Sequence, residues 1–268
     1  MLDNKRQTIH KGCYLKRLNG TTQGLRPRTR GAIICLPHAG GSAGFFRTWA
    51  ASVPKDITLF GVQYPGREER MHELSIENMD ELVQGIAPSL VGLSNLPYVL
   101  FGHSMGAAVA FELAGKLEKM GLPASLLMMS SHPPLDEIIP SHFHQCSDDE
   151  LWREMIRIGG TSPDILQQTE LTKLLTPVLR ADYQLIETYQ SSATQKLSTR
   201  MLICLGDNDP DVPAENIHGW QRFSQQPISI LEKQGGHFYL NDHQASLIDE
   251  AVNAINGLMF NNIRDYLP

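Results

Sequence analysis

The sequence predicts an α/β protein built on a doubly wound, mostly parallel sheet with helices on both faces. Short apolar runs alternate along the chain with segments of helical periodicity, which is typical of parallel sheets. A Gly-x-Ser-x-Gly motif lies directly between one such run and one such helical segment. Between residues 133 and 195 the alternation stops and the signals become all-helical, which predicts a helical insertion over the sheet.

The individual elements follow from these patterns in chain order. Strands are expected near residues 32–36, 58–63, 97–102, 125–130, 200–205 and 227–232. Helices outside the insertion are expected near residues 44–52, 76–93, 105–120, 214–224 and 243–257. The last helix is expected to begin after Asn241 and Asp242, because both residue types are good N-caps and apolar residues at helical spacing follow them.

The motif G-H-S-M-G at residues 102–106 is the most informative part of the chain. A short apolar, aromatic run precedes it, and a segment rich in alanine and other helix formers follows it. In this context the motif is the nucleophile elbow, in which glycines leave room for a sharp turn and the serine hydroxyl is exposed at the top of a sheet. The alternative, a chance turn of Gly and Ser, is disfavoured by the flanking strand and helix.

A nucleophilic Ser104 requires a base and an acid, and both follow it in the sequence. His237 comes after a Gly-Gly turn behind the last expected strand, and Asp209 comes after the strand before it. Asp207 and Asp211 are alternatives for the acid, since Asp also favours turns. Asp209 is preferred because Asp207 follows the glycine of the G-x-x-D pattern too closely. The order Ser, Asp, His is that of the α/β-hydrolases.

The expected roles follow from acid–base chemistry. His237 takes the proton of Ser104 as the hydroxyl attacks a carbonyl carbon, and Asp209 fixes the imidazole tautomer and stabilises its charged form. The carbonyl oxygen becomes negative and needs two preorganised donors. One is the backbone N–H of Met105, and we expect the other to be that of Ala39 in the glycine-rich loop after the first strand.

An all-helical insertion at this point in an α/β-hydrolase is a lid over the nucleophile. Ser147 and Glu150 have the spacing of a capping box, and Gly159-Gly160 either end that helix or offer a hinge. Pro177 is expected to kink or divide the long apolar stripe that follows, because proline removes a helical amide bond. The expected division is an N-terminal leader (1–30), an α/β-hydrolase core (31–132 and 196–268) and a helical lid (133–195).

The chain resembles the type II thioesterases, the stand-alone editing hydrolases of non-ribosomal peptide and polyketide assembly lines. The stretches that carry the resemblance are P-H-A-G-G-S at 37–42, Q-Y-P-G-R-E at 63–68, G-H-S-M-G at 102–106, L-R-A-D-Y at 179–183, G-D-N-D-P at 206–210 and G-G-H-F at 235–238. The resemblance implies an acyl or aminoacyl substrate, thioester-linked to the phosphopantetheine arm of a carrier protein. The apolar stripe of the lid then either packs on the core or lines the acyl pocket.

Two other functions fit parts of the sequence. A small-molecule esterase or lipase on the same fold would share the elbow, but the Y-P-G-R and L-R-A-D-Y stretches and the lack of an H-G-G-G loop disfavour it. A non-catalytic protein on an inactive hydrolase fold would not need the complete set Ser104, Asp209 and His237. Serine chemistry needs no cofactor or metal, and the alternating His142, His144 and Cys146 are not expected to bind one.

Composition sets the remaining expectations. A chain of 268 residues that is 41% hydrophobic can form one α/β domain, and four cysteines without a C-x-x-C pair suggest a reduced, cytoplasmic setting. No apolar run is long enough to span a membrane, and the net charge of −6 disfavours nucleic acid as a partner. A monomer is expected. Arg67 and Arg70 are candidates for docking an acidic carrier protein, although a structural role fits either equally well.

Overall fold

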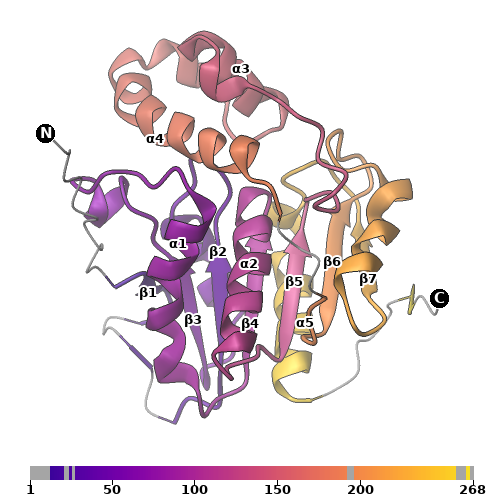
Figure 1. The fold of residues 1–268 in the computed structure, drawn as a ribbon. Coiled ribbons are helices and arrows are strands. Elements are labelled where there is room, and N and C mark those ends of the chain that lie inside the picture. The colour runs from indigo at the N-terminus through magenta and orange to yellow at the C-terminus, as the bar shows by residue number, and fades with distance from the viewer. Residues whose placement is uncertain (1–12, 21–23, 26–27, 192–195, 258–263, 266–268) are drawn as a thin grey trace, which may run out of the picture.

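The fold was analysed in a computed structural model that describes residues 13–20, 24–25, 28–191, 196–257 and 264–265. Its centre is an eight-stranded sheet in the order β1-β3-β2-β4-β5-β6-β7-β8 (Figure 1). The strands are β1 (Leu15–Arg17), β2 (Gly31–Leu36), β3 (Ile57–Val62), β4 (Tyr98–His103), β5 (Leu126–Ser130), β6 (Met201–Gly206), β7 (Ser229–Lys233) and β8 (Arg264–Asp265). Strands β2 to β7 run parallel, and the two edge strands are antiparallel to their neighbours.

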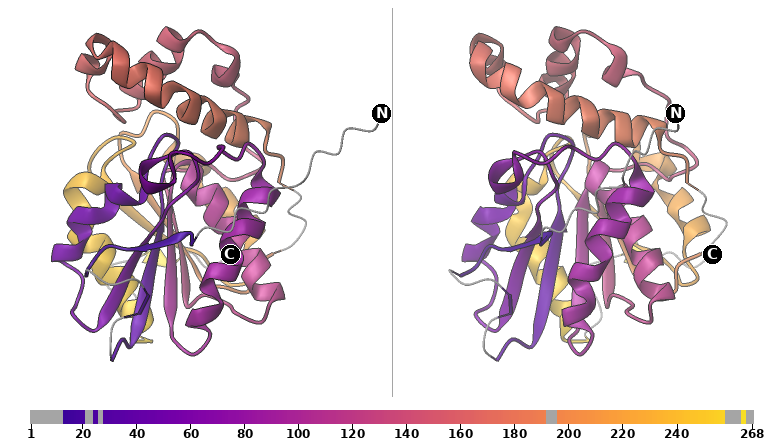
Figure 2. Two further views of the ribbon diagram at one scale, coloured as in Figure 1. Left: turned by 90° about the vertical axis from the view of Figure 1, so that its left-hand side faces the viewer. Right: turned by 60° about the vertical axis from the view of Figure 1, so that its left-hand side comes forward.

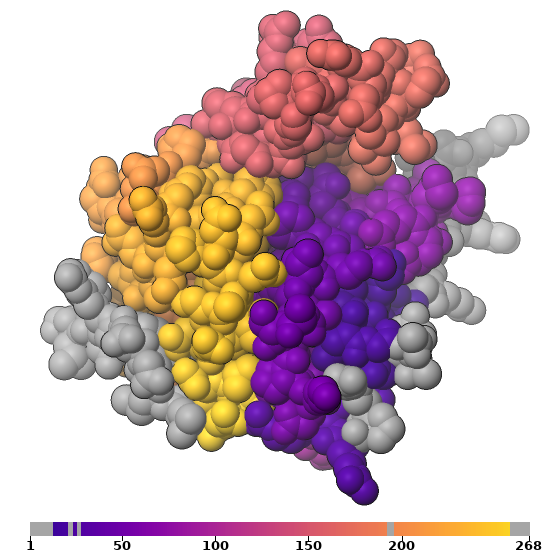
Figure 3. Space-filling model, turned by 180° about the vertical axis from the view of Figure 1, so that it is seen from behind, coloured from indigo at the N-terminus to yellow at the C-terminus, as the bar shows by residue number. Residues whose placement is uncertain are grey.

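Alternating side chains of the strands supply two separate hydrophobic layers. On β2, Ile34 faces one layer and Ile33 and Cys35 face the other, as expected for a strand that is buried on both sides. The first layer is covered by α1 (Met79–Ile86), α2 (Met105–Lys119), η3 (Ala87–Leu93) and η6 (Ala214–Phe223). The second is covered by η1 (Ala43–Ala51) and α5 (Leu240–Ile255), which lie side by side on the rear face in Figure 3.

The segment between β5 and β6 forms a separate group of helices. It contains η4 (Phe143–Gln145), α3 (Asp148–Arg157), η5 (Pro163–Gln167) and α4 (Thr169–Thr188). Figures 1 and 2 show α3 and α4 lying across the edge of the sheet where strand β4 passes into the turn before α2. The parallel strands end at this edge, so their carboxyl-terminal loops lie beneath these helices.

Two sequence signals in this helical segment have the predicted structural effect. Ser147 and Glu150 form the capping box, with each side chain accepting a hydrogen bond from the backbone amide of the other residue. Gly159 has φ +83°, and Gly160 N–H donates to the Met155 carbonyl at 2.8 Å. Gly159 N–H also donates to the Ile156 carbonyl, and the two bonds form a Schellman motif. The two glycines therefore end α3 as its C-cap.

The predicted strands are confirmed to within two residues, but other expectations were wrong. Residues 15–17 of the expected leader form edge strand β1, whereas residues 1–12, 21–23 and 26–27 lie outside the described residues. Pro177 does not divide α4, because it is exposed and its missing amide bond is on the solvent side of the helix.

The last helix has a short turn that was not predicted before its expected start. Helix α5 (Leu240–Ile255) joins two helices across a kink at His243, with φ −115° and ψ 16°, so its longer second part begins behind Asn241 and Asp242 as expected. Asn241 and Asp242 already donate their amides to carbonyls three residues back, so tight turns start the coil directly behind the preceding loop. Within the described part of the chain, no helix combines the length and the apolar character needed to cross a membrane.

The junction of β4 and α2 depends on two glycines that allow backbone contacts. A Cβ on Gly102 would lie 2.2 Å from the Gly106 carbonyl oxygen, and a Cβ on Gly106 would lie 2.2 Å from the Leu36 carbonyl oxygen. Because both obstacles are backbone atoms, no side chain can move aside. Helix α2 therefore begins in direct contact with the ends of two strands.

We expect Gly106→Ala to lower the free energy of unfolding by about 1–3 kcal/mol or more, because the new methyl group overlaps fixed backbone. Gly92→Ala is the matched control, since no atom lies within 4 Å of a Cβ there. Urea unfolding followed by circular dichroism measures both variants. Equal stability of the two variants would show that the backbone contact at Gly106 is less restrictive than its geometry implies.

Candidate active site

The elbow between β4 and α2 has the strained backbone that its sequence predicts. Ser104 has φ +54° and ψ −124°, in a region that non-glycine residues adopt at a cost of about 1–3 kcal/mol. Its amide donates to the Ser130 carbonyl at 2.8 Å, and its own carbonyl accepts from Ala107 N–H at 2.8 Å. These bonds tie the strained residue to the neighbouring strand and to the first turn of α2.

The structure brings His237 and Asp209 into direct contact. His237 Nδ1 lies 3.0 Å from Asp209 Oδ2 and 3.1 Å from Oδ1, and both side chains are buried. Gly206 makes this contact possible, because a Cβ there would lie 2.4 Å from the Gly235 carbonyl oxygen and would separate the two turns. A carboxylate bonded to Nδ1 fixes the tautomer that has its free lone pair on Nε2.

The other two aspartates in the turn have different partners. Asp207 Oδ1 accepts the Gly235 amide at 2.8 Å, which is a turn-stabilising contact. Asp211 pairs with Arg157 at the end of α3 at 2.8 Å, while its backbone amide donates to Asp209 Oδ1 at 3.0 Å. Only Asp209 of the three contacts the histidine ring by hydrogen bonding among the residues described.

Asp209 is ionised in this environment. Burial alone would raise its pKa, but the hydrogen bond and charge of His237, together with the Asp211 amide, outweigh burial and hold the pKa below its ordinary value. The carboxylate therefore carries the negative charge that stabilises an imidazolium on His237.

Ser104 and His237 line one cavity, together with both expected oxyanion donors, Met105 and Ala39. His237 Nε2 is buried and has no hydrogen-bond partner in the described part of the chain, and thus none to Ser104 Oγ. Neither the Met105 nor the Ala39 amide donates to another described residue. The cavity thus presents one hydroxyl, one free imidazole nitrogen and two free amides.

Three further buried histidines surround the catalytic candidate. Burial, followed by repulsion from the charge of His237, lowers the pKa of His38 to about 3 and that of His103 well below its usual range. Burial also lowers the pKa of His132, to about 4. The His103 ring centroid lies 5.3 Å from that of His237, so the two rings pack side by side. All three rings are neutral, so they keep the surroundings of His237 free of positive charge.

The cavity has a volume of about 390 Å³ and lies between the core and the helices above it. Met155 and Ile158 of the α3 region and Tyr183 and Ile186 of α4 form an apolar wall opposite Ser104. Other residues of the same stripe, among them Leu179, are buried in the core. The stripe thus packs on the core along some turns of α4 and borders the cavity along others.

The candidate metal ligands engage protein partners. His144 Nδ1 bonds to Glu187 at 2.5 Å, and Cys146 Sγ contacts a backbone carbonyl at 3.4 Å. In the described residues, the donor group with metal-like spacing consists of Asp209, Asp211 and His237, whose ligand atoms lie within 4.8 Å of one another. These ligand atoms already have protein partners, because the His237 ring bonds to Asp209 and Asp211 pairs with Arg157.

Arg67 and Arg70 are buried and paired, which favours the structural alternative over the docking of a carrier protein. Both are about 95% buried. Arg70 pairs with Glu73 at 2.6 Å, and Arg67 pairs with Asp182 of α4 at 2.6 Å. The sequence analysis missed the second pair. Arg67 belongs to the Y-P-G-R stretch and Asp182 to the L-R-A-D-Y stretch. The opposite charges in these two motifs were the one sequence feature that could have predicted the pair.

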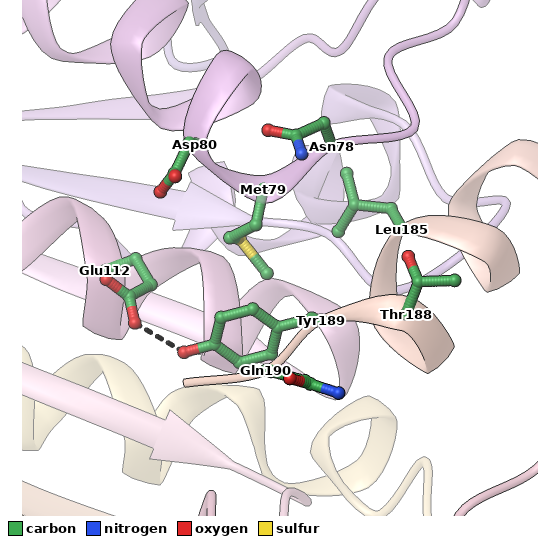
Figure 4. Close-up of a pocket in the computed structure, with 8 residues that line it drawn as sticks. All are labelled: Asn78, Met79, Asp80, Glu112, Leu185, Thr188, Tyr189 and Gln190. Atoms are coloured by element: carbon green, nitrogen blue, oxygen red, sulfur yellow. Dashed lines mark hydrogen bonds between the residues drawn. The ribbon is translucent and has the colours of Figure 1, made fainter. Parts of the chain in front are cut away.

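A second pocket of about 260 Å³ lies between α1, α2 and the end of α4 (Figure 4). Its lining includes Asp80 and Thr188, and the Tyr189 hydroxyl bonds to Glu112 across it. It shares no lining residue with the cavity at Ser104. The predicted site residues therefore gather in one of these two pockets only.

The chain belongs to the thioesterase family, because the sequence model of the thioesterase domain matches residues 32–255. It is an α/β-hydrolase-fold enzyme that acts as a thioesterase. Thioesterase PikA5 of Streptomyces venezuelae is 34% identical over 238 residues, covering 87% of this chain and 82% of that protein. The chain spans 62% of a probable cadicidin biosynthesis thioesterase of Streptomyces griseus, at 33% identity.

Solved structures place the chain among type II thioesterases. The type II thioesterase BorB from the borrelidin biosynthetic cluster superposes with a TM-score of 0.81 at 33% identity, covering 92% of this chain and 99% of BorB. YbtT, a type II thioesterase from the yersiniabactin pathway, has a TM-score of 0.80 at 28% identity, covering 91% and 98%. The family resemblance noted in the sequence is confirmed.

Acid should destabilise the protein through its buried neutral histidines. Burial lowers the pKa of His132 to about 4 from the ordinary 6.5, against the opposing effect of its bond to the Pro133 carbonyl. Between these values the unfolded chain binds the extra proton, so the free energy of unfolding falls by about 1.4 kcal/mol per pH unit for this residue as the pH decreases. His132→Asn, whose amide can still donate to Pro133, should reduce the slope by that amount.

Urea unfolding at several values between pH 7 and pH 4.5 measures this slope. The exposed His72 is the matched control, and His72→Asn should keep the slope of the wild type. A His132→Asn variant with the wild-type slope would contradict the neutral state of the buried ring.

Proposed function

We propose that the protein hydrolyses acyl or aminoacyl thioesters on the phosphopantetheine arm of carrier proteins, and thereby regenerates misprimed non-ribosomal peptide or polyketide synthases. The observation that carries the proposal is the buried His237–Asp209 pair, whose free Nε2 opens into the cavity that Ser104 lines. Membership of the thioesterase family and similarity to type II thioesterases support the same activity.

In the proposed mechanism, Ser104 Oγ attacks the thioester carbonyl carbon while His237 Nε2 accepts the hydroxyl proton. The negative oxygen of the tetrahedral intermediate accepts hydrogen bonds from the Ala39 and Met105 amides. Breaking the carbon–sulfur bond releases the phosphopantetheine thiol, which takes the proton from His237. Water, deprotonated by His237, then attacks the acyl-Ser104 ester, and the bond to Ser104 Oγ breaks as His237 returns the proton to that oxygen, which releases the carboxylic acid. Asp209 stabilises the imidazolium in both halves of the reaction.

The helices of residues 133–195 serve as the lid in this proposal, and the core consists of 31–132 and 196–268. Their apolar wall favours an acyl chain in the cavity, because burying its methylene groups is worth about 0.8 kcal/mol each. One chain supplies every residue of the site, which supports action as a monomer. All four cysteines are free thiols, which supports a reducing, cytoplasmic setting.

Ser104→Ala should abolish hydrolysis of an acetyl-loaded carrier protein, lowering kcat by at least about 10⁴-fold, because no nucleophile remains. Release of the carrier thiol, followed by mass spectrometry of the carrier, measures the rate. The variant should unfold at the same urea concentration as the wild type. A strong preference of the wild type for p-nitrophenyl acetate over the loaded carrier would instead indicate a small-molecule esterase.

Asp209→Asn should lower kcat by about 10³–10⁴-fold, because an amide neither fixes the reactive tautomer nor stabilises the imidazolium. Asp207→Asn is the matched control two residues away, with an expected rate within about threefold of wild type, since Asp207 contacts only the turn. Rates on the same acetyl-loaded carrier decide the assignment. A larger loss of kcat in the Asp207 variant than in the Asp209 variant would show that Asp209 is not the catalytic acid.

A further inference from the structure

We propose that Arg67 and Asp182 are positioning residues for the oxyanion hole. Their buried ion pair holds the loop of residues 37–42, which carries the Ala39 amide, and ties this loop to helix α4. The inference rests on the proposed function, because it assumes that the Ala39 amide stabilises the negative oxygen.

The pair is bidentate and shielded from solvent. Arg67 Nη1 lies 2.6 Å from Asp182 Oδ2, and Arg67 Nη2 lies 2.8 Å from Oδ1. The side chains are 6% and 4% exposed. Two parallel charge-assisted bonds define both distance and orientation, so the geometry of this pair is more sharply fixed than that of a surface pair.

Both members of the pair also bond to the loop. Asp182 Oδ2 accepts the Gly40 amide at 2.7 Å, and Arg67 Nη1 donates to the Gly41 carbonyl at 3.0 Å. The pair therefore holds both residues that directly follow Ala39: Asp182 accepts a hydrogen bond from one of them, and Arg67 donates a hydrogen bond to the other. Gly40 has φ +74°, a left-handed conformation that glycine adopts more easily than other residues, and in this turn its amide bonds to Asp182.

Other contacts hold the two ends of the loop, where the Tyr64 hydroxyl donates to the Pro37 carbonyl and the Ser42 hydroxyl donates to Glu68. The Gly41 amide closes the turn onto the His38 carbonyl, and the Ala43 amide bonds to Gln63, whose own amide bonds to the Arg67 carbonyl. Without Asp182 the exposed Gly40 would lose the acceptor of a part-buried bond, and the turn that follows Ala39 would lose its direct attachment to α4, which favours a shifted backbone. Because an oxyanion donor must lie about 2.7–3.1 Å from the position that the oxyanion takes, such a shift at Ala39 affects catalysis.

Docking of a partner by Arg67 does not compete with this role. Its Nε donates to the Pro65 carbonyl, and its two Nη atoms serve Asp182 and Gly41. Asp182 precedes Tyr183, which lines the cavity, so the helix that encloses the substrate also holds the oxyanion loop. The site is thus assembled by contacts from the core and from α4 together.

Asp182→Asn tests the proposal with little change in volume. We expect kcat on an acetyl-loaded carrier to fall by about 10²–10³-fold per folded enzyme, with KM within about threefold of wild type. Inhibition by an acyl trifluoromethyl ketone, which forms a tetrahedral adduct with Ser104, should weaken in proportion to kcat/KM. A purely structural role would lower stability without this parallel loss of transition-state affinity.

The control is Glu118→Gln on α2, where a half-buried carboxylate accepts the Thr199 amide at 2.6 Å, away from the loop. It should lose stability but keep kcat and inhibitor affinity. Arg67→Lys, measured in parallel, keeps a charge beside Asp182 but loses the forked contact with Asp182 and the bond to the Gly41 carbonyl, and should lower kcat about tenfold. If Asp182→Asn does not fold, the Arg67→Lys result decides.

A charge reversal, Arg67→Asp with Asp182→Arg, distinguishes the effect of the ion pair itself from the effect of its bonds to the loop. It restores opposite charges, but the guanidinium introduced at position 182 cannot accept the Gly40 amide, so kcat should stay at least about 10²-fold low. Wild-type kcat in this double variant, in Asp182→Asn or in Arg67→Lys would overturn the inference. The proposed function is tested separately, by the loss of hydrolysis in Ser104→Ala.

Discussion

The close backbone contact at the start of α2 determines most of the site. With no side chains at positions 102 and 106, the first turn of the helix touches the end of β4 and the carbonyl of Leu36. One packing contact therefore places Ser104 in its strained conformation, exposes the Met105 amide and brings the loop at 37–42 alongside. The helix packs tightly through Ala107 and other buried residues, and this packing offsets the cost of the strained serine.

Around His237, one ionised carboxylate lies among neutral imidazole rings. Asp209 is ionised, whereas His38, His103 and His132 are held neutral by burial. Of the four rings in this cluster, His237 is the one that has a carboxylate beside it. The neutral rings also exclude water around the pair, and low polarity strengthens the attraction between imidazolium and carboxylate.

Features with a local sequence signal were predictable, and features without one were not. The parallel strands, the capping box and the placement of Asp209 behind His237 follow from periodicity and turn chemistry within a few residues. The edge strand at 15–17 is only three residues long, and too short to show alternation. The partners Arg67 and Asp182 are 115 residues apart, and an isolated charge carries no information about its distant partner. Only folding brings the two motifs together.

Two ion pairs attach α3 and α4 to the core, and salt affects them differently. The pair of Arg157 and Asp211 is 45% and 37% exposed, so mobile ions within a Debye length of about 8–10 Å screen it. The Arg67–Asp182 pair is 6% and 4% exposed, and ions cannot enter between its members. As ionic strength rises, the ion pair that attaches α3 is therefore weakened before the ion pair that attaches α4 to the loop of residues 37–42. Concentrated salt thus acts on the α3 side of the cavity while the backbone that carries the Ala39 amide keeps its attachment.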